Sequence, residues 1–178
     1  VYITDTTAPT LVLPADITLN CGSETLPSIT GLASANDACS YVTISYIDGD
    51  MEGDNCFSSF IRLWTATDAC GNAVSGEQLI SIEDNTGPVL IGIPGNTNQQ
   101  CGEIPEPPLV VAFDVCQNDS VTVLFNEVIY GQGCQKAVFR TWTAIDSCGN
   151  SSSITRSIYV NDTQGPVISC PDDVVLNC

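Results

Sequence analysis

Asp68 and Asp146 each stand two residues before a cysteine in the same local pattern, Trp-Thr-Ala-x-Asp-x-Cys-Gly-Asn. Threonine and aromatic residues favour a β-strand, and the glycine supplies the permissive backbone that a tight turn needs. The aspartate and the asparagine at the end of such a strand present oxygen atoms to one turn. Oxygen atoms of this kind are the ligands of hard cations such as Ca²⁺. The first chemistry that the pattern suggests is therefore the holding of a metal ion.

This pattern belongs to an internal repeat, because its residues recur about 78 positions later in the chain. Each copy opens on an aspartate four residues before a proline, at Asp5, Asp84 and Asp162. The sequence therefore predicts a first repeat over residues 1–83, a second over 84–161 and the truncated start of a third over 162–178. We expect the chain to be a piece of a longer protein.

The fold class follows from short β-like runs separated by turn signals, with no apolar stripe of helical period. This spacing predicts an all-β protein of tandem immunoglobulin-like antiparallel β-sandwich repeats. The inter-sheet cysteine pair with a tryptophan between its members, typical of antibody domains, is absent. In the first repeat the expected strands are Thr10–Leu13, Ile17–Asn20, Ile29–Ala35, Tyr41–Ile47, Phe57–Thr67 and Gln78–Ile82.

The amino-acid composition limits which partners the protein can bind and in which cellular compartment it occurs. Four cationic residues face 21 carboxylates, for a net charge of −17. This excludes nucleic acid as a partner and disfavours anionic lipid. No apolar run reaches the ~20 residues of a membrane span. Ten cysteines occur with no histidine and no Cys-x-x-Cys, so disulfides are a better interpretation than zinc. Disulfides place the protein outside the cell or on its surface.

Strand directions predict how the cysteines pair. If successive long segments run back and forth, each sandwich has a linker pole, where the chain enters, and a far pole at its other end. In the first repeat Cys21 and Cys56 meet at the far pole, while Cys39 and Cys70 meet at the linker pole. The predicted disulfides are Cys21–Cys56 and Cys39–Cys70, with Cys101–Cys134 and Cys116–Cys148 in the second repeat. The partners of Cys170 and Cys178, which belong to the third repeat, stay open.

The same directions gather acidic residues at each linker pole. Clustered carboxylates repel one another unless a cation compensates them, and Ca²⁺ accepts six to eight oxygen ligands. The alternative is that these aspartates only cap turns, as aspartate often does. The candidate calcium ligands are Asp5, Asp37, Asp68 and Asn72 in the first repeat and Asp84, Asp114, Asp146 and Asn150 in the second.

The motifs together resemble the HYR-like, immunoglobulin-like repeats of very large bacterial surface adhesins. They are similar above all to those of Bacteroidota, including the gliding-motility adhesins exported by the type IX route. The resemblance rests on Asp-x-Thr-x-Pro, Ala-x-Asp-x-Cys and Trp-Thr-Ala-x-Asp-x-Cys-Gly-Asn, and it covers essentially the whole chain. It implies an extracellular stalk or filament of tandem domains that contact neighbouring repeats, with calcium near the junctions. Repeats one and two lack the Cys-Pro of HYR domains, which appears only at Cys170.

Two other functions are alternatives to this stalk, a binding module and a hydrolase. The alternative is a glycan- or surface-binding module whose exposed loops hold a surface glycan. Trp64 and Trp142 could form sugar platforms, but their mid-strand positions favour a core role. Arg62 and Arg140 lie on the same strand face as these rings, where each can stack on an aromatic ring or pair with a buried carboxylate. An acid-pair hydrolase is disfavoured because the acids recur in both repeats, which suits structure more than a single cleft. We predict no enzyme.

Overall fold

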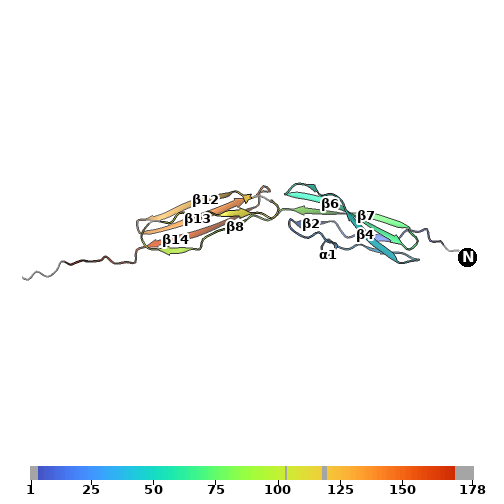
Figure 1. The fold of residues 1–178 in the computed structure, drawn as a ribbon, viewed down its shortest axis with the longest axis horizontal. Coiled ribbons are helices and arrows are strands. Elements are labelled where there is room, and N and C mark those ends of the chain that lie inside the picture. Colours follow the sequence, from blue (N-terminus) through green and yellow to red (C-terminus); the bar gives the residue numbers. More distant parts are fainter. Residues whose placement is uncertain (1–3, 103, 118–119, 171–178) are drawn as a thin grey trace, which may run out of the picture.

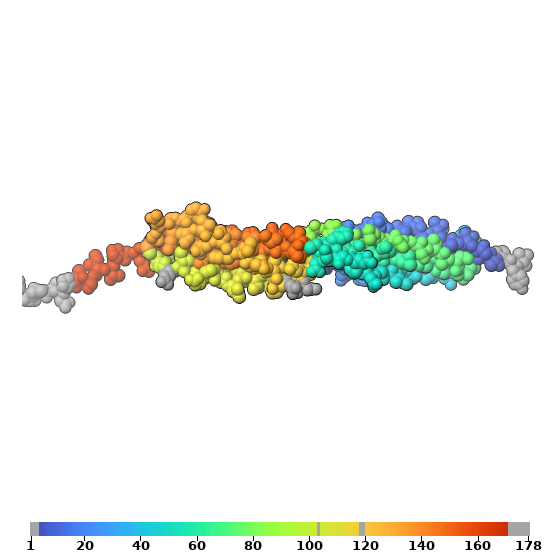
Figure 2. Space-filling model, turned by 90° about the horizontal axis from the view of Figure 1, so that it is seen from above, coloured from blue at the N-terminus to red at the C-terminus, as the bar shows by residue number. Residues whose placement is uncertain are grey.

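The computed structural model describes residues 4–102, 104–117 and 120–170. Its strands form two groups that share no sheet, and the groups lie end to end in an elongated molecule (Figure 1). Figure 2 shows the same rod from above, with the first group coloured blue to green and the second yellow to red. The fold is therefore all-β, with tandem immunoglobulin-like sandwiches, as the sequence predicts.

The first sandwich packs a two-stranded sheet, β1-β3, against a larger sheet ordered β2-β7-β6-β4, in which β5 also pairs with β6. All pairs are antiparallel except β2 with β7. The strands are β1 (Thr10–Val12), β2 (Ile17–Asn20), β3 (Ser34–Asn36), β4 (Val42–Asp48), β5 (Glu52–Gly53), β6 (Phe57–Asp68) and β7 (Ala73–Glu83).

The second sandwich repeats this plan, with sheets ordered β11-β10-β8 and β12-β13-β14-β9. Again one pair, β14 with β9, is parallel. The strands are β8 (Val89–Ile91), β9 (Thr97–Gln99), β10 (Val111–Phe113), β11 (Ser120–Val121), β12 (Val123–Gln132), β13 (Gln135–Ile145) and β14 (Ser151–Asn161).

One expected strand of the first repeat is wrong in its first half. Residues 29–35 begin with the end of a short helix, α1 (Pro27–Thr30), and only then enter β3. Pro27 at the start of the helix has a backbone angle suited to that position, and Gly31 ends it with a positive φ of 101°. Within the described residues, no helix has the length and apolar character to cross a membrane.

The core of each sandwich is centred on one long strand whose side chains alternate between the interior and the surface. On β6 the inward residues include Trp64 and Ala66, and on β13 they include Trp142 and Ala144. Trp64 is 3% exposed and Trp142 is 2% exposed. Both tryptophans are therefore core residues, and neither offers a flat platform to a sugar.

The arginine of each long strand reaches a carboxylate, as the sequence allows. Arg62 is buried and donates from Nε to Asp48 Oδ1 (2.6 Å) and from Nη1 to Thr30 Oγ1 (2.7 Å). Its guanidinium also lies 4.6 Å from the centroid of the Tyr46 ring. Arg140 donates in the same manner to Glu127 Oε2 at 2.7 Å.

We expect Arg62→Ala to destabilise the first repeat by about 3 kcal/mol, toward the lower end for a broken buried ion pair. The loss is moderated because the Asp48 side chain is 37% exposed and regains water. Urea unfolding followed by Trp64 fluorescence, in a Trp142→Phe background, measures this repeat alone. Lys136→Ala, a cation of the second repeat, is the control. Equal midpoints for Arg62→Ala and the control would contradict a structural role for the buried arginine.

Candidate metal centre at the repeat junction

The aspartate before each Cys-Gly-Asn turn organises that turn. Asp68 Oδ1 accepts the backbone N–H groups of Cys70 (2.9 Å) and Asn72 (2.8 Å). Asp146 does the same for Cys148 and Asn150 at the same distances. The glycine between them has a φ of 90° in both turns, which a side chain would strain. Turn capping is thus one role of Asp68 and Asp146.

Each turn asparagine ties its turn to the incoming linker. Asn150 Nδ2 donates to Asp146 Oδ2 (3.1 Å) and to the backbone carbonyl of Asp84 (3.0 Å). Asn72 Nδ2 makes the equivalent bonds with Asp68 Oδ2 (2.7 Å) and the carbonyl of Asp5 (3.2 Å). The sequence predicts both asparagines as metal ligands. The structure places both beside the cluster, with only the amide oxygen left for an ion.

A second loop at each linker pole is capped in the same way. Asp37 Oδ1 accepts the N–H of Cys39 at 2.9 Å, and Asp114 Oδ1 accepts that of Cys116 at 2.8 Å. The two loops of a pole are joined by one further hydrogen bond, which in the first repeat runs from Ala69 N to Ser40 Oγ at 3.2 Å. Both linker poles are therefore built alike.

The linker aspartates are left with an unsatisfied oxygen. Asp84 Oδ1 accepts the N–H (3.1 Å) and hydroxyl (3.2 Å) of Thr86, while Asp84 Oδ2 is buried with no hydrogen-bond partner among the described atoms. Asp5 Oδ2 is in the same state. Asp84 is only 6% exposed. A buried carboxylate oxygen without a partner is unfavourable, so a positively charged partner fits this position.

Asp84 also lies at the meeting point of the acidic residues of the second repeat. It forms one group with Asp114 and Cys116, and another with Asp146 and Cys148, with ligand atoms within 4.8 Å of one another in each group. Both cysteines are disulfide-bonded, so their sulfur atoms are not ligands. The remaining donors are carboxylate oxygens, which match Ca²⁺ better than a thiophilic metal.

The equivalent cluster of the first repeat contains Asp5, Asp37 and Cys39. Within the residues that the structure describes, Asp68 does not join this group and reaches the linker through Asn72 instead. The charge of Asp5, together with burial and Asp37, raises the pKa of the Cys39 thiol. The thiol therefore stays protonated at neutral pH, and this cluster too offers oxygen ligands.

Two disulfides cross from the first sandwich to the second. Cys21 is bonded to Cys116 and Cys56 to Cys148, with Cα–Cα distances of 5.8 and 5.3 Å. The predicted pairs Cys21–Cys56 and Cys116–Cys148 are therefore wrong. The strand directions place all four cysteines at the correct poles, but the far pole of repeat one abuts the linker pole of repeat two. The sequence carries a signal for this pairing: it predicts two cysteines at each pole, and the far pole of one repeat must meet the linker pole of the next.

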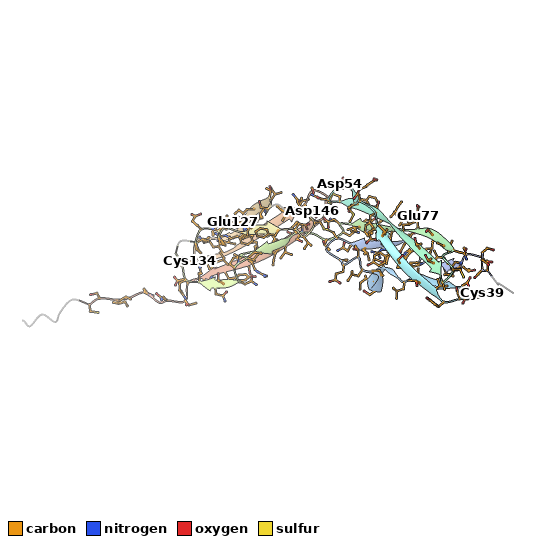
Figure 3. The ribbon with its side chains drawn as sticks, turned by 45° about the vertical axis from the view of Figure 1, so that its right-hand side comes forward. Cys39, Asp54, Glu77, Glu127, Cys134 and Asp146 are labelled. Carbon is orange, nitrogen blue, oxygen red and sulfur yellow. A yellow bond between two sulfur atoms is a disulfide. The ribbon has the colours of Figure 1, made fainter. Side chains whose placement is uncertain are left out.

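The remaining cysteines lie at the outer ends of the rod. Cys101 is bonded to Cys134, the pair expected from the sequence, with a Cα–Cα distance of 4.9 Å. Cys39 and Cys70 are exposed and not bonded to each other, so that predicted pair is absent from the structure. Figure 3 shows Cys39 and Cys134 at opposite ends and Asp146 at the junction. Cys170 is exposed and unbonded, and Cys178 lies outside the described residues.

Small residues permit the close approach at the junction. A Cβ placed on Gly22, beside Cys21, would lie 2.8 Å from Val115 Cγ1, beside Cys116. In the linker, a Cβ on Gly87 would lie 2.7 Å from the carbonyl oxygen of Ser151, the first residue of β14. Glycine at these two positions keeps the abutting poles and the linker in contact.

Hydrogen bonds decide the ionisation of Asp68. Burial alone raises its pKa, but the side-chain amide of Asn72 and the backbone N–H groups of the turn outweigh burial and hold the pKa below its ordinary value. A carboxyl group with a lowered folded-state pKa contributes stability above its unfolded pKa. That contribution is lost as the pH falls through the folded pKa.

Comparisons with known proteins assign the chain to no family. No protein-family model matches the chain, and no curated protein matches it. Solved structures with a similar arrangement include Drosophila N-cadherin EC1-4, at 12% identity and a TM-score of 0.36, covering 88% of this chain and 50% of that one. Human mucin-like protocadherin EC1-2 is 6% identical with a TM-score of 0.33, covering 86% and 99%. The chain spans half the length of the N-cadherin structure.

Disulfide mapping tests the junction directly. A digest under non-reducing conditions should yield a Cys21 peptide joined to a Cys116 peptide, and a Cys56 peptide joined to a Cys148 peptide. Both should separate after reduction, which is the internal control. A Cys21 peptide joined to Cys56 would show that each sandwich is closed on itself and that no covalent link crosses the junction.

Replacing Asn72 by alanine should raise the pKa of Asp68, because burial then acts with fewer opposing hydrogen bonds. The loss of stability in acid should accordingly begin at a higher pH than in the parent protein. Carboxyl-carbon NMR titration in the presence of a chelator measures this pKa. Asn126→Ala, an exposed position on β12, is the control. An unchanged Asp68 pKa in Asn72→Ala would refute the role given to the asparagine.

Proposed function

We propose that the chain is a segment of a stiff extracellular stalk whose repeats are covalently joined and bind Ca²⁺ at their junction. The repeats are residues 1–83, residues 84–161 and the start of a third at 162–178. The observation that carries the proposal is the junction itself. Two disulfides cross it beside a buried acidic cluster in which Asp84 Oδ2 has no partner among the described atoms.

An extracellular location is supported by disulfide chemistry. Disulfides persist in oxidising compartments and are rare in the cytosol. Among the described residues, three bonds join six of the ten cysteines. The net charge of −17 favours solubility and argues against a nucleic-acid partner. The resemblance to HYR-like repeats supports a cell-surface adhesin of the kind used in gliding motility and exported by the type IX route.

The calcium component of the proposal assigns the ligands to one side of the junction. Asp84, Asp114 and Asp146 supply carboxylate oxygens, and the amide group of Asn150 is hydrogen-bonded to Asp84 and Asp146 beside them. A bound Ca²⁺ supplies positive charge to this cluster. The chain's own hydrogen bonds fix the turn loops and the linker in place whether or not the ion is bound. The neighbouring repeat is thus the main partner of each repeat, and no catalysis is assigned.

The alternative, a glycan-binding module, receives less support. Its candidate platforms, Trp64 and Trp142, are buried among core side chains. The sequence repeats its acids and cysteines at the poles of the sandwich, where neighbouring repeats meet. We therefore favour the stalk. In a stalk, any surface glycan would bind to regions other than the junction.

Calcium should raise the melting temperature of the second repeat, followed by Trp142 fluorescence in a Trp64→Phe background. An ion at one hundred times its Kd adds about 2.7 kcal/mol to the free energy of unfolding. For a domain of this size such a gain is worth roughly 10–20 °C. Asp84→Asn should remove most of the shift, because it deletes the unpaired anionic oxygen and keeps the shape.

Asp162→Asn, which changes the equivalent but exposed aspartate of the third copy, is the matched control and should keep the full shift. Without calcium, Asp84→Asn should be at least as stable as the parent, because clustered negative charge is reduced. A parent protein whose melting temperature does not respond to calcium would mean that these aspartates only cap turns.

Small-angle scattering with and without chelator, before and after disulfide reduction, separates the two contributions to stiffness. The oxidised protein should keep one rod-like profile in both solvents, because two covalent links cross the junction. The reduced protein should broaden its distance distribution, and more so in chelator. A reduced, calcium-free sample as rigid as the oxidised one would show that neither feature stiffens the rod.

A further inference from the structure

The second sandwich contains an open cavity of about 220 Å³ between β9, β13, β14 and residues 105–108. Its wall includes three prolines, Trp142 and Ile158, and it also includes Arg140 and Arg156. None of the lining residues belongs to the acidic groups at the junction. The cavity therefore lies within the second repeat and is separate from the candidate metal centre.

A shorter loop distinguishes this part of the second repeat from the first. The arginine of each long strand donates from Nη2 to a backbone carbonyl, which belongs to Thr25 in the first repeat and to Pro105 in the second. Eight residues, 26–33, then lead to β3 and include the helix α1. Only five residues, 106–110, lead to β10, and they contain no helix. The second repeat therefore lacks the groups that α1 supplies.

In the first repeat these groups satisfy the buried donors. Thr30, at the end of α1, accepts the Nη1 donor of Arg62 with its hydroxyl (2.7 Å) and the side-chain amide of Gln78 with its carbonyl (2.8 Å). Gln78 in turn accepts the indole N–H of Trp64 at 3.1 Å. The arginine and the tryptophan of the first repeat thus both have an acceptor.

The equivalent donors of the second repeat have lost their acceptors. Arg156 stands where the first repeat has Gln78, and a guanidinium group cannot accept a hydrogen bond. Among the described residues, neither Arg140 Nη1 nor Trp142 Nε1 has a hydrogen-bond acceptor, although these residues are only 5% and 2% exposed. Buried donors without an acceptor are unfavourable, so a ligand with acceptor atoms fits this cavity.

Charge favours an anionic ligand. Arg140 and Arg156 are direct cross-strand partners on β13 and β14, an arrangement in which like charges repel, whereas the first repeat places uncharged Gln78 opposite its arginine. Arg140 is paired with Glu127, but Arg156 has no ion pair within the described part of the chain. Glu106, the acidic residue of the lining, is exposed. The cavity therefore holds one positive charge that no carboxylate contacts.

We propose that this cavity binds a small organic monocarboxylate with a compact apolar body. The carboxylate accepts from Arg156 and from the unpartnered donors of Arg140 and Trp142, since a guanidinium fork matches carboxylate geometry. The apolar body packs against the prolines and the tryptophan ring. A single unpaired arginine matches a monoanion better than a phosphate dianion. The inference goes beyond the proposed stalk and does not depend on it.

Benzoate is a probe of suitable size, because a cavity of about 150 Å³ holds benzene. The indole N–H signals of the full chain are followed by NMR during a benzoate titration in calcium-free buffer. The Trp142 signal should shift to saturation, while the Trp64 signal, whose N–H is bonded to Gln78, should stay in place. Benzyl alcohol, which is uncharged and similar in size, should give no saturating shift at tenfold higher concentration.

Two charge-matched variants locate the site. Arg156→Gln introduces the residue that the first repeat carries at this position, and it should weaken benzoate binding at least tenfold. Lys136→Gln removes the same charge from β13 outside the cavity and should change the affinity less than twofold. Glu106→Gln removes a nearby negative charge and should tighten binding at least twofold at low salt. Unchanged urea midpoints establish that the variants are folded.

Two further probes define the ligand class. Glucuronate, which carries its carboxylate on a polar ring, should bind at least tenfold more weakly than benzoate, because the wall is largely apolar. Inorganic phosphate should also bind more weakly. Tighter binding of either probe would overturn the proposed ligand class. The site itself is overturned if both indole signals move alike, if benzyl alcohol binds as tightly as benzoate, or if Arg156→Gln leaves the affinity unchanged. None of these results depends on calcium or on the junction.

Discussion

Asp84 connects the two sandwiches through three of its own groups, and the junction depends on it. Its N–H donates to the carbonyl of Cys56 in the first repeat, and its carbonyl accepts from Asn150 in the second. Its side chain caps the linker through Thr86, keeps one buried oxygen without a partner among the described atoms, and lies within the acidic cluster of the second repeat. Together with the two crossing disulfides, these hydrogen bonds of Asp84 hold the linker to both sandwiches.

The scarcity of cations explains why the acids of the junction lack a protein partner. The chain has four cationic side chains, of which Arg62 and Arg140 pair with carboxylates inside the sandwiches. A third, Arg156, donates to the carbonyl of Pro94. The carboxylates of the poles are therefore compensated by backbone N–H groups and asparagine amides, which stabilise an anion but do not cancel its charge. The calcium ion that we propose at the junction would supply the missing positive charge.

The features that local pattern and internal repetition determine could be predicted from the sequence. The alternation along β6 and β13 identifies the strands and the buried tryptophans, and the repeat places acids and cysteines at the correct poles. It does not give the disulfide partners, since whether Cys21 bonds to Cys56 or to Cys116 depends on how the two sandwiches abut. Nor does it give the orientation of Asn150, whose amide is drawn to the linker carbonyl by tertiary contact. The helical turn of α1 is also missed, because Pro27 and Gly31 act inside an apolar run that favours a strand.

The crossed disulfides also determine how tension travels through the molecule. A pull on the N-terminal end can peel away β1 and β2, and then reaches Cys21, from which the covalent path continues directly to Cys116. The bond closes a sequence separation of 95 residues, so the chain between them lies off the shortest path under load. The strands β3 to β7 are thus shielded from extension, and the second bond, from Cys56 to Cys148, shields a similar length in parallel. Such a rod resists lengthening by bypassing its folded regions, and its limit of extension is set by covalent bonds more than by the stability of either sandwich.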